Sequence, residues 1–243
     1  MNAPKVVSEA DWLTARKELL EKEKELSRQR DELTRLRQEL PWRKVEQSYE
    51  FDGPNGIRSL LELFGESRQL LVYHFMFAPD WKEGCKACSL VADHYDPLVI
   101  HLKARDVSMV TVSRAPIETL DAYKQRMGWS FDWVSSLNNQ FNRDFGVTFT
   151  EEEKNEGRMN YNYRLGSFPV TECPGISSFA RNEDGEVFHT YSAYSRGLEN
   201  ILGIYNLLDL VPKGRDEAEL PYGMAWGRHH DQYGDETVVD PYA

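Results

Sequence analysis

The sequence has few cysteines, no excess of positive charge and no long apolar run. Only three of its 243 residues are cysteines, too few for the disulfide framework of a small secreted domain. Its 29 basic side chains are outnumbered by 40 acidic ones, and the net charge of −11 argues against nucleic-acid or anionic-membrane binding. No apolar run reaches the roughly 18 residues that a membrane span requires.

The N-terminal residues also lack the apolar core of a signal peptide, which predicts a cytoplasmic location. In that reducing compartment, three cysteines indicate catalysis or metal binding rather than a structural disulfide. The length and a hydrophobic content of 40% are sufficient for one domain with a buried core and extensions at its ends. We expect an N-terminal helical arm (1–44), a globular domain (45–212) with an insertion near 150–168, and a C-terminal tail (213–243).

Cys85 and Cys88 form a C-x-x-C motif between an apolar run at residues 70–77 and a helical pattern that Pro97 interrupts. The run is typical of a strand covered on both faces. Cys85 would then lie at a helix N-terminus, where unpaired N–H groups and the helix dipole lower the pKa of a thiol. Lys86 adds a positive charge beside it. The motif therefore predicts a redox-active dithiol.

Other uses of this motif remain open. C-x-x-C is also half of a zinc site, although no second half follows at zinc-finger spacing and the only other cysteine is Cys173. A peroxiredoxin-like peroxidase would carry Thr or Ser three residues before its reactive cysteine, where this chain has Lys82. The third alternative is a binding module with non-catalytic thiols. We expect neither a bound metal nor a cofactor.

The order of the remaining elements predicts an α/β fold. A β-branched strand at 107–112 completes a β-α-β unit with the apolar run, which requires parallel strands. Residues 176–181 and 186–191 have the pattern of a hairpin, and helices are expected at 57–64, 116–128 and 197–210. Strands before and after a central β-α-β unit, followed by a last helix, describe a thioredoxin-type sheet. The polar tail beyond residue 212 is expected to be a partly ordered terminus.

Residues 8–40 predict one long helix that begins at a Ser8 cap. Its apolar residues recur every seven positions, but the second apolar position that a coiled coil needs in each heptad is mostly not apolar. The pattern is therefore half of a coiled-coil seam. They are Trp12, Leu19, Leu26, Leu33 and Leu40. We expect a homodimer, or a larger homo-oligomer, through this helix; the alternative is a helix that folds back on its own domain.

Several longer motifs resemble a bacterial family of predicted dithiol-disulfide oxidoreductases whose physiological function is essentially unknown. The resemblance covers nearly the whole chain and is carried by the strand with its C-x-x-C helix and by residues 128–136, 144–147, 189–192 and 196–217. It implies a thioredoxin-like three-layer sandwich with a peroxiredoxin-like elaboration. The implied partners are a protein or small-molecule disulfide and a reductant of unknown identity.

The wider thioredoxin pattern then implies roles for individual residues. Cys85 matches the attacking thiol and Cys88 the resolving thiol, and Trp81 resembles the aromatic residue that precedes the motif. His74 takes the place of the buried carboxylate that relays a proton in thioredoxin. The alternative, which the sequence supports about equally, is that this histidine is a core residue with a hydrogen-bond partner and relays no proton.

Thioredoxins also place a cis-proline opposite the thiols. Pro174 is the nearest candidate, although it lies about three residues early and Ser177 occupies the more natural register. If Pro174 faces the motif, Cys173 would lie beside the two thiols as a third redox or metal-binding group. A polar aromatic cluster that includes Tyr191 and Arg196 is a candidate substrate wall, with a hydrogen-bonded structural corner as the alternative. Its other members are Tyr161, Tyr163, Arg164 and Tyr194.

Overall fold

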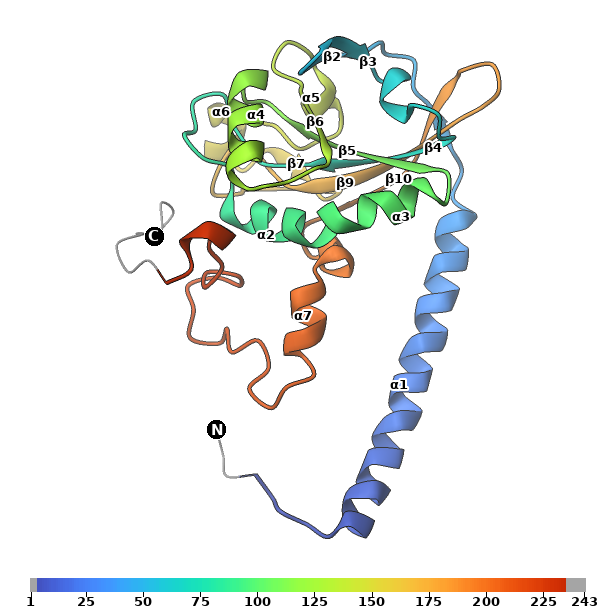
Figure 1. Ribbon diagram of the computed structural model, residues 1–243, viewed down its shortest axis with the longest axis vertical. Coiled ribbons are helices and arrows are strands. Elements are labelled where there is room, and N and C mark those ends of the chain that lie inside the picture. The colour runs from blue at the N-terminus through green and yellow to red at the C-terminus, as the bar shows by residue number, and fades with distance from the viewer. Residues whose placement is uncertain (1–3, 235–243) are drawn as a thin grey trace. The chain divides into compact units, whose positions relative to one another are not determined.

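The computed structural model describes residues 4–234, and its internal contacts divide the chain into two units at Trp42 and Arg43. The first unit contains α1 (Glu9–Gln38), the helix that the arm sequence predicts (Figure 1). The side chain of Ser8 accepts a hydrogen bond from the backbone N–H of Asp11 at 3.2 Å, which confirms the predicted cap. Ion pairs three residues apart, such as Glu25 with Arg28, support the helix locally.

The second unit is built on an eight-stranded sheet with the strand order β1-β10-β9-β4-β5-β6-β2-β3. β4 is parallel to β5, which confirms the predicted β-α-β unit, and β9 is antiparallel to β4. The hairpin of β9 and β10 is also confirmed. The strands are Arg43–Lys44 (β1), Glu50–Gly53 (β2), Gly56–Ser59 (β3), Gln69–His74 (β4), Val107–Ser113 (β5), Asp132–Ser135 (β6), Gly175–Arg181 (β9) and Val187–Tyr194 (β10).

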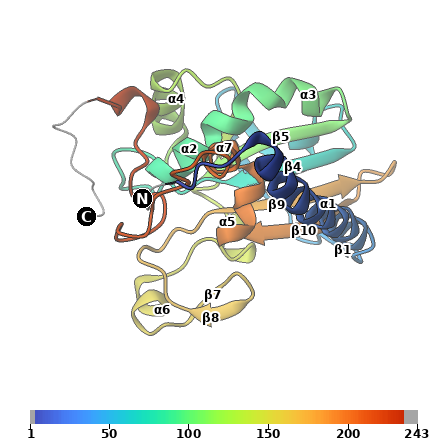
Figure 2. The same ribbon diagram turned by 90° about the horizontal axis from the view of Figure 1, so that it is seen from below.

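Short helices pack around this sheet, and a small hairpin lies beside α6 (Figure 2). The helices are Lys86–Tyr95 (α2), Val99–Lys103 (α3), Ile117–Arg126 (α4), Phe141–Asp144 (α5), Glu151–Asn155 (α6) and Gly203–Leu208 (α7). The hairpin consists of Met159–Tyr161 (β7) and Arg164–Gly166 (β8). A 3-10 turn at Asp96–Leu98 separates α2 from α3, because Pro97 interrupts the helix as expected. Further 3-10 turns are Glu62–Phe64, Ser195–Ile201 and His230–Gln232.

Apolar side chains form a cluster on each face of the sheet. The cluster that contains both thiols also receives side chains from α2, α4 and α7, together with Tyr73 of β4 and Phe75, which follows that strand. The opposite cluster receives Phe141 and Phe145 from α5 and its end, together with Val72 of β4. The parallel β4–β5 pair, the antiparallel β9–β10 hairpin and the layers on both faces are the thioredoxin-like arrangement predicted from the sequence, elaborated by β6 and the β2–β3 hairpin.

Two predicted helices are wrong. Residues 57–64 form β3 and a 3-10 turn instead, because Gly56 adopts φ +116° and turns the chain back from β2 into a hairpin. The predicted helix at 197–210 is divided into the 3-10 turn and α7, since Leu202 between them has φ −102° and ψ 79°. Among residues 4–234, no helix is both long enough and apolar enough to cross a membrane.

Candidate functional site

The C-x-x-C motif lies where the chain passes from β4 into α2 (Figure 1). Cys85 is the N-cap residue of α2, and its N–H donates to the carbonyl of Met76 at 3.0 Å. Its own carbonyl accepts from the N–H of Ser89 at 2.9 Å. These bonds hold the thiol at the start of the helix, as the sequence predicted.

Gly84 is required immediately before the motif. A β-carbon at this position would lie 2.6 Å from Phe75 and 3.0 Å from Tyr123, which is closer than side-chain contacts allow. The absence of a side chain therefore lets the loop pack against the aromatic cluster below it. The hydroxyls of Tyr123 and Ser89 share a hydrogen bond of 2.9 Å, which links α4 to the first turn of α2.

The two thiols are free, buried and electrostatically different. A hydrogen bond from Cys88 lowers the pKa of Cys85, and the N–H groups of Cys88 and Ala87 and the charge of Lys86 act in the same direction against burial. Burial and the neighbouring Cys85 raise the pKa of Cys88 well above its ordinary value. The first cysteine is therefore the more acidic thiol of the pair, and the second is the one that holds its proton more strongly.

Tyr73 is the β4 side chain that faces Cys88. Its hydroxyl has no hydrogen-bond partner of ordinary geometry among residues 4–234, and burial, followed by the thiol of Cys88, raises its pKa. Burial still raises the pKa of Cys88, and this hydroxyl and the N–H of Met76, which lies 3.5 Å from the sulfur, oppose the rise without reversing it. Tyr73 was not among the candidates from the sequence, because the apolar run does not show which of its side chains face the thiols.

His74 points to the opposite face of the sheet from Tyr73, since successive residues of a strand alternate. Its ring stacks on Phe141 and Phe145, and its Nε2 lies 2.8 Å from the hydroxyl of Ser177. Burial lowers the pKa of His74 to about 3, so the ring is neutral. The proposed proton relay to the thiols is therefore wrong in its location, and the core interpretation fits the contacts.

Trp81 and Lys86 lie close to the motif, as predicted. Trp81 is half-buried and packs against the cluster that contains the thiols. Lys86 is buried, and its Nζ donates to the carbonyl of Ala225 at 3.3 Å. The lysine therefore brings its charge next to Cys85 while its end contacts the C-terminal segment.

Cys173 and Pro174 occupy the loop before β9. No peptide bond within residues 4–234 is cis, so the expected cis-proline is absent from the described chain. Burial raises the pKa of Cys173, which makes this thiol unreactive. Over the same residues, no three His, Cys, Asp or Glu side chains gather closely enough to hold a metal ion, so Cys173 does not complete such a set.

The polar aromatic cluster is tied to backbone groups. The hydroxyl of Tyr161 donates to the carbonyl of Pro174 at 2.7 Å and accepts from the N–H of Ser195 at 2.9 Å. Tyr194 donates to the carbonyl of Phe145 at 2.9 Å. Arg196 is exposed and pairs with Glu199 at 2.8 Å. These contacts are those of a hydrogen-bonded corner at the end of β10. Tyr191 of the same predicted wall lies half-buried in β10.

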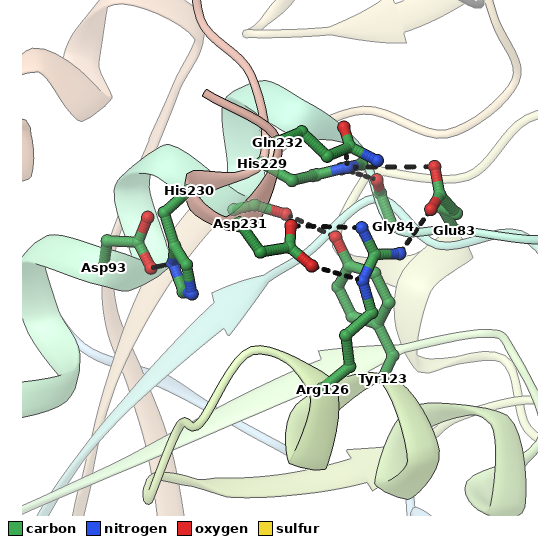
Figure 3. A network of polar contacts seen from close by, with 10 residues as sticks. Glu83, Gly84, Asp93, Tyr123, Arg126, His229, His230, Asp231 and Gln232 are labelled. Carbon is green, nitrogen blue, oxygen red and sulfur yellow. Dashed lines mark hydrogen bonds and ion pairs between the residues drawn. The ribbon is translucent and has the colours of Figure 1, made fainter. Parts of the chain in front are cut away.

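The described residues of the predicted C-terminal tail contact the globular unit at several points, and the tail beyond residue 234 lies outside the described residues. His229 is buried, and its Nε2 donates to the carbonyl of Gly84 at 2.9 Å. Figure 3 shows this contact within a network that joins the tail to α2, α4 and the loop before the motif. Nothing in the sequence indicates where the adjacent His229 and His230 would bind.

Among curated proteins, no sequence matches the chain. The solved structures similar to it include the peroxidoxin BcpB of Mycobacterium tuberculosis, with 15% identity, a TM-score of 0.46, and coverage of 68% of this chain and 94% of that one. A mutant of Xanthomonas campestris peroxiredoxin Q has 12% identity and a TM-score of 0.45, covering 69% and 98%. A structure described as a "putative Thiol:disulfide interchange protein DsbE from Chlorobium tepidum" has 15% identity and a TM-score of 0.40, covering 68% and 97%.

One family matches over almost the entire sequence. Its description reads "Bacterial protein of unknown function (DUF899)", and the match extends over residues 1–233. The matched region therefore includes the arm, the C-x-x-C motif and the tail segment that contacts the residues on either side of Cys85. The chain belongs to this bacterial family of unknown function.

Proposed function

We propose that the protein is a thiol-disulfide oxidoreductase that uses Cys85 and Cys88. The observation that supports this most directly is the placement of Cys85 as the N-cap of α2, with its pKa lowered while that of its partner Cys88 is raised. One thiolate and one protonated thiol in contact are the starting state for disulfide exchange.

The reaction has two steps. The Cys85 thiolate attacks one sulfur of a substrate disulfide, so that the substrate S–S bond breaks and a mixed disulfide forms while the other substrate sulfur leaves as a thiolate. Cys88 then loses its proton to that released base and attacks the Cys85 sulfur. The Cys85–Cys88 disulfide forms, and the second substrate thiolate leaves. The substrate gains two electrons and the protein loses two, which an external dithiol reductant restores.

A redox titration tests this proposal. We expect the protein, equilibrated with mixtures of oxidised and reduced dithiothreitol, to lose two hydrogens reversibly and to form one Cys85–Cys88 disulfide. Cys173 should remain a thiol throughout, because its buried sulfur has a raised pKa. Alkylation followed by peptide mass mapping measures all three cysteines in the same sample.

Two further measurements, of bound metal and of oxidation by peroxide, separate the other two functions that the motif leaves open. Stoichiometric zinc or iron in freshly purified protein would replace the redox proposal with a metal-binding module. Oxidation by peroxide in preference to disulfides, through a sulfenic acid on Cys85, would favour a peroxidase. We expect neither result, and a cytoplasmic location would keep the resting thiols reduced.

We also propose that α1 pairs with the α1 helix of a second copy in an antiparallel homodimer. The first turn of α1 contains Glu9 and Asp11, and its last turn contains Arg35 and Arg37. Antiparallel pairing brings the acidic end of one helix beside the basic end of the other. The apolar residues at intervals of seven, which we call the leucine stripe, supply the apolar contacts. They are Trp12, Leu19, Leu26, Leu33 and Leu40, and none of them is buried within the described chain.

Charges placed on the stripe should dissociate this dimer. We expect Leu26→Glu with Leu33→Glu to convert a dimer into a monomer at micromolar concentration, measured by sedimentation or light scattering. Ser27→Glu with Thr34→Glu adds the same charges one position away from the stripe and should leave the dimer intact. A wild-type protein that is monomeric at these concentrations would rule out the pairing.

A further inference from the structure

The C-terminal strap, residues 222–232, covers the N-terminus of α2 and has no part in the proposed reaction. Figure 3 shows its contact with the residue before Cys85, where the ring of His229 lies against the carbonyl of Gly84. The same ring packs edge-on against Tyr123, with 5.7 Å between ring centroids. The strap therefore contacts both the residue before Cys85 and the α4 ring that packs below it.

A second contact involves the residue after Cys85. The ammonium group of Lys86 donates to the carbonyl of Ala225 and lies 5.7 Å from the ring centroid of Tyr222. Both sequence neighbours of the reactive cysteine are thus bound by the strap. Cys85 itself is only 7% exposed.

Ion pairs fasten the far end of the strap to the body of the domain (Figure 3). Arg126 of α4 donates to Asp231 at 2.7 and 3.1 Å and also pairs with Glu83 in the loop before the motif. His230 lies 2.7 Å from the carboxylate of Asp93 on α2. The Arg126 guanidinium therefore joins the strap, α4 and the cysteine loop in one network.

The near end of the strap is fixed by Glu217. One carboxylate oxygen of this residue accepts hydrogen bonds from the hydroxyl of Tyr205, the N–H of Met224 and the indole of Trp226, all between 2.7 and 2.8 Å. Met224 and Trp226 also pack against the apolar cluster that contains the thiols. The strap is consequently held at both ends, and between them it contacts Lys86 and Gly84, the two residues that flank Cys85.

We propose that the strap determines the substrate class: small or thin, extended disulfides reach Cys85, and disulfides on the surface of folded proteins do not. This rests on the proposed function. Exchange requires the Cys85 sulfur to contact the substrate S–S bond. A disulfide set in a folded surface brings its own backbone to the start of α2, where the strap already binds Gly84 and Lys86. Release of the strap would therefore widen the range of substrates.

Access to Cys85 is measured by alkylation, which does not depend on disulfide exchange. The full-length double variant His229→Ala with Asp231→Asn removes the contacts to Gly84 and Arg126. We expect its Cys85 to react with a maleimide on a polymer chain of several kilodaltons about tenfold faster than wild type, because lost hydrogen bonds to a charged group raise the open population. The rate with N-ethylmaleimide should change less than about threefold. Disulfide-bonded protein substrates should show the same selective gain.

Two further variants control this comparison. Glu219→Gln alters an exposed residue that precedes the strap and should keep both rates at the wild-type level. Asp231→Asn alone breaks a partly exposed ion pair and leaves the core intact, so it can replace the double variant if that variant unfolds. We expect it to give an intermediate gain in the reaction rate of Cys85 with the large maleimide. Equal gains for the small and large probes, or no gain for the large one, would overturn the strap as a selector. A selective gain without any disulfide exchange would overturn the redox function and leave the gated access established.

Discussion

Replacement of Cys88 by serine is expected to turn the protein into a covalent trap for its substrate. Without the second thiol, the mixed disulfide formed at Cys85 cannot be resolved. We expect most of the Cys88→Ser protein to carry substrate after one exposure to a disulfide, against a few per cent at most in the wild type. Non-reducing mass spectrometry measures the adduct, and mapping locates it at Cys85.

The asymmetry between the two cysteines is what this experiment examines. Cys85→Ser should retain no substrate, because burial is the largest cause of the raised pKa of Cys88, it remains when Cys85 is replaced, and a buried protonated thiol is a poor nucleophile. Turnover should fall by at least about a thousandfold in that variant, as expected for the loss of an attacking group.

Cys173→Ser is the matched control. It removes a buried thiol without touching the motif and should trap nothing and turn over like the wild type. Equal trapping by Cys85→Ser and Cys88→Ser would contradict the assigned roles. The absence of trapping with every disulfide tested would contradict the reaction itself.

The fold was predictable where the sequence pattern is local. The apolar run of β4 and the helical spacing after Cys85 indicated the strand and helix, because buried strands and helices have characteristic periods. Pro97 and the turn before Val187 also act through short-range geometry. Gly56 carries the same kind of signal, since the preceding asparagine and this glycine favour a hairpin, but the apolar residues after it suggested a helix.

The side of the sheet that each residue faces was harder to predict. Tyr73 and His74 are adjacent, so they must point to opposite faces, and the run of apolar residues gave no alternation to show which face carries the thiols. Only the packing of α2 decides this. It places Tyr73 with Cys88 and His74 with Phe141.

The strap could not be predicted from the sequence. Its contacts join residues that are more than a hundred positions apart, such as His229 with Gly84 and Asp231 with Arg126. Such long-range contacts leave no periodic pattern in the sequence. The polar composition of the segment is then the main signal, and it is typical of a chain terminus without fixed structure. Its aromatic residues Tyr222 and Trp226 were the available signal, because large rings seldom remain in water without a packing partner.

His74 should make the protein unusually sensitive to acid. Its ring is buried between Phe141 and Phe145, its Nε2 contacts Ser177, and its Nδ1 has no hydrogen-bond partner within the described chain. Burial, and to a lesser extent the neighbouring His189, lower its pKa to about 3. The unfolded chain therefore binds this proton from about pH 6.5 downward while the folded protein does not, so the free energy of unfolding falls as the pH is lowered.

This sensitivity is measurable by comparison with a variant that does not titrate. Linkage predicts that acidification from pH 7 to pH 4 costs the wild type about 3 kcal/mol more than it costs His74→Phe, which keeps an aromatic ring in the stack. Urea unfolding at pH 7, 6, 5 and 4 gives both curves. His101→Gln removes an exposed histidine and should follow the wild type at every pH. If the His74→Phe and wild-type curves run parallel, the proton is accommodated in the folded core and the buried, neutral state assigned to His74 is wrong.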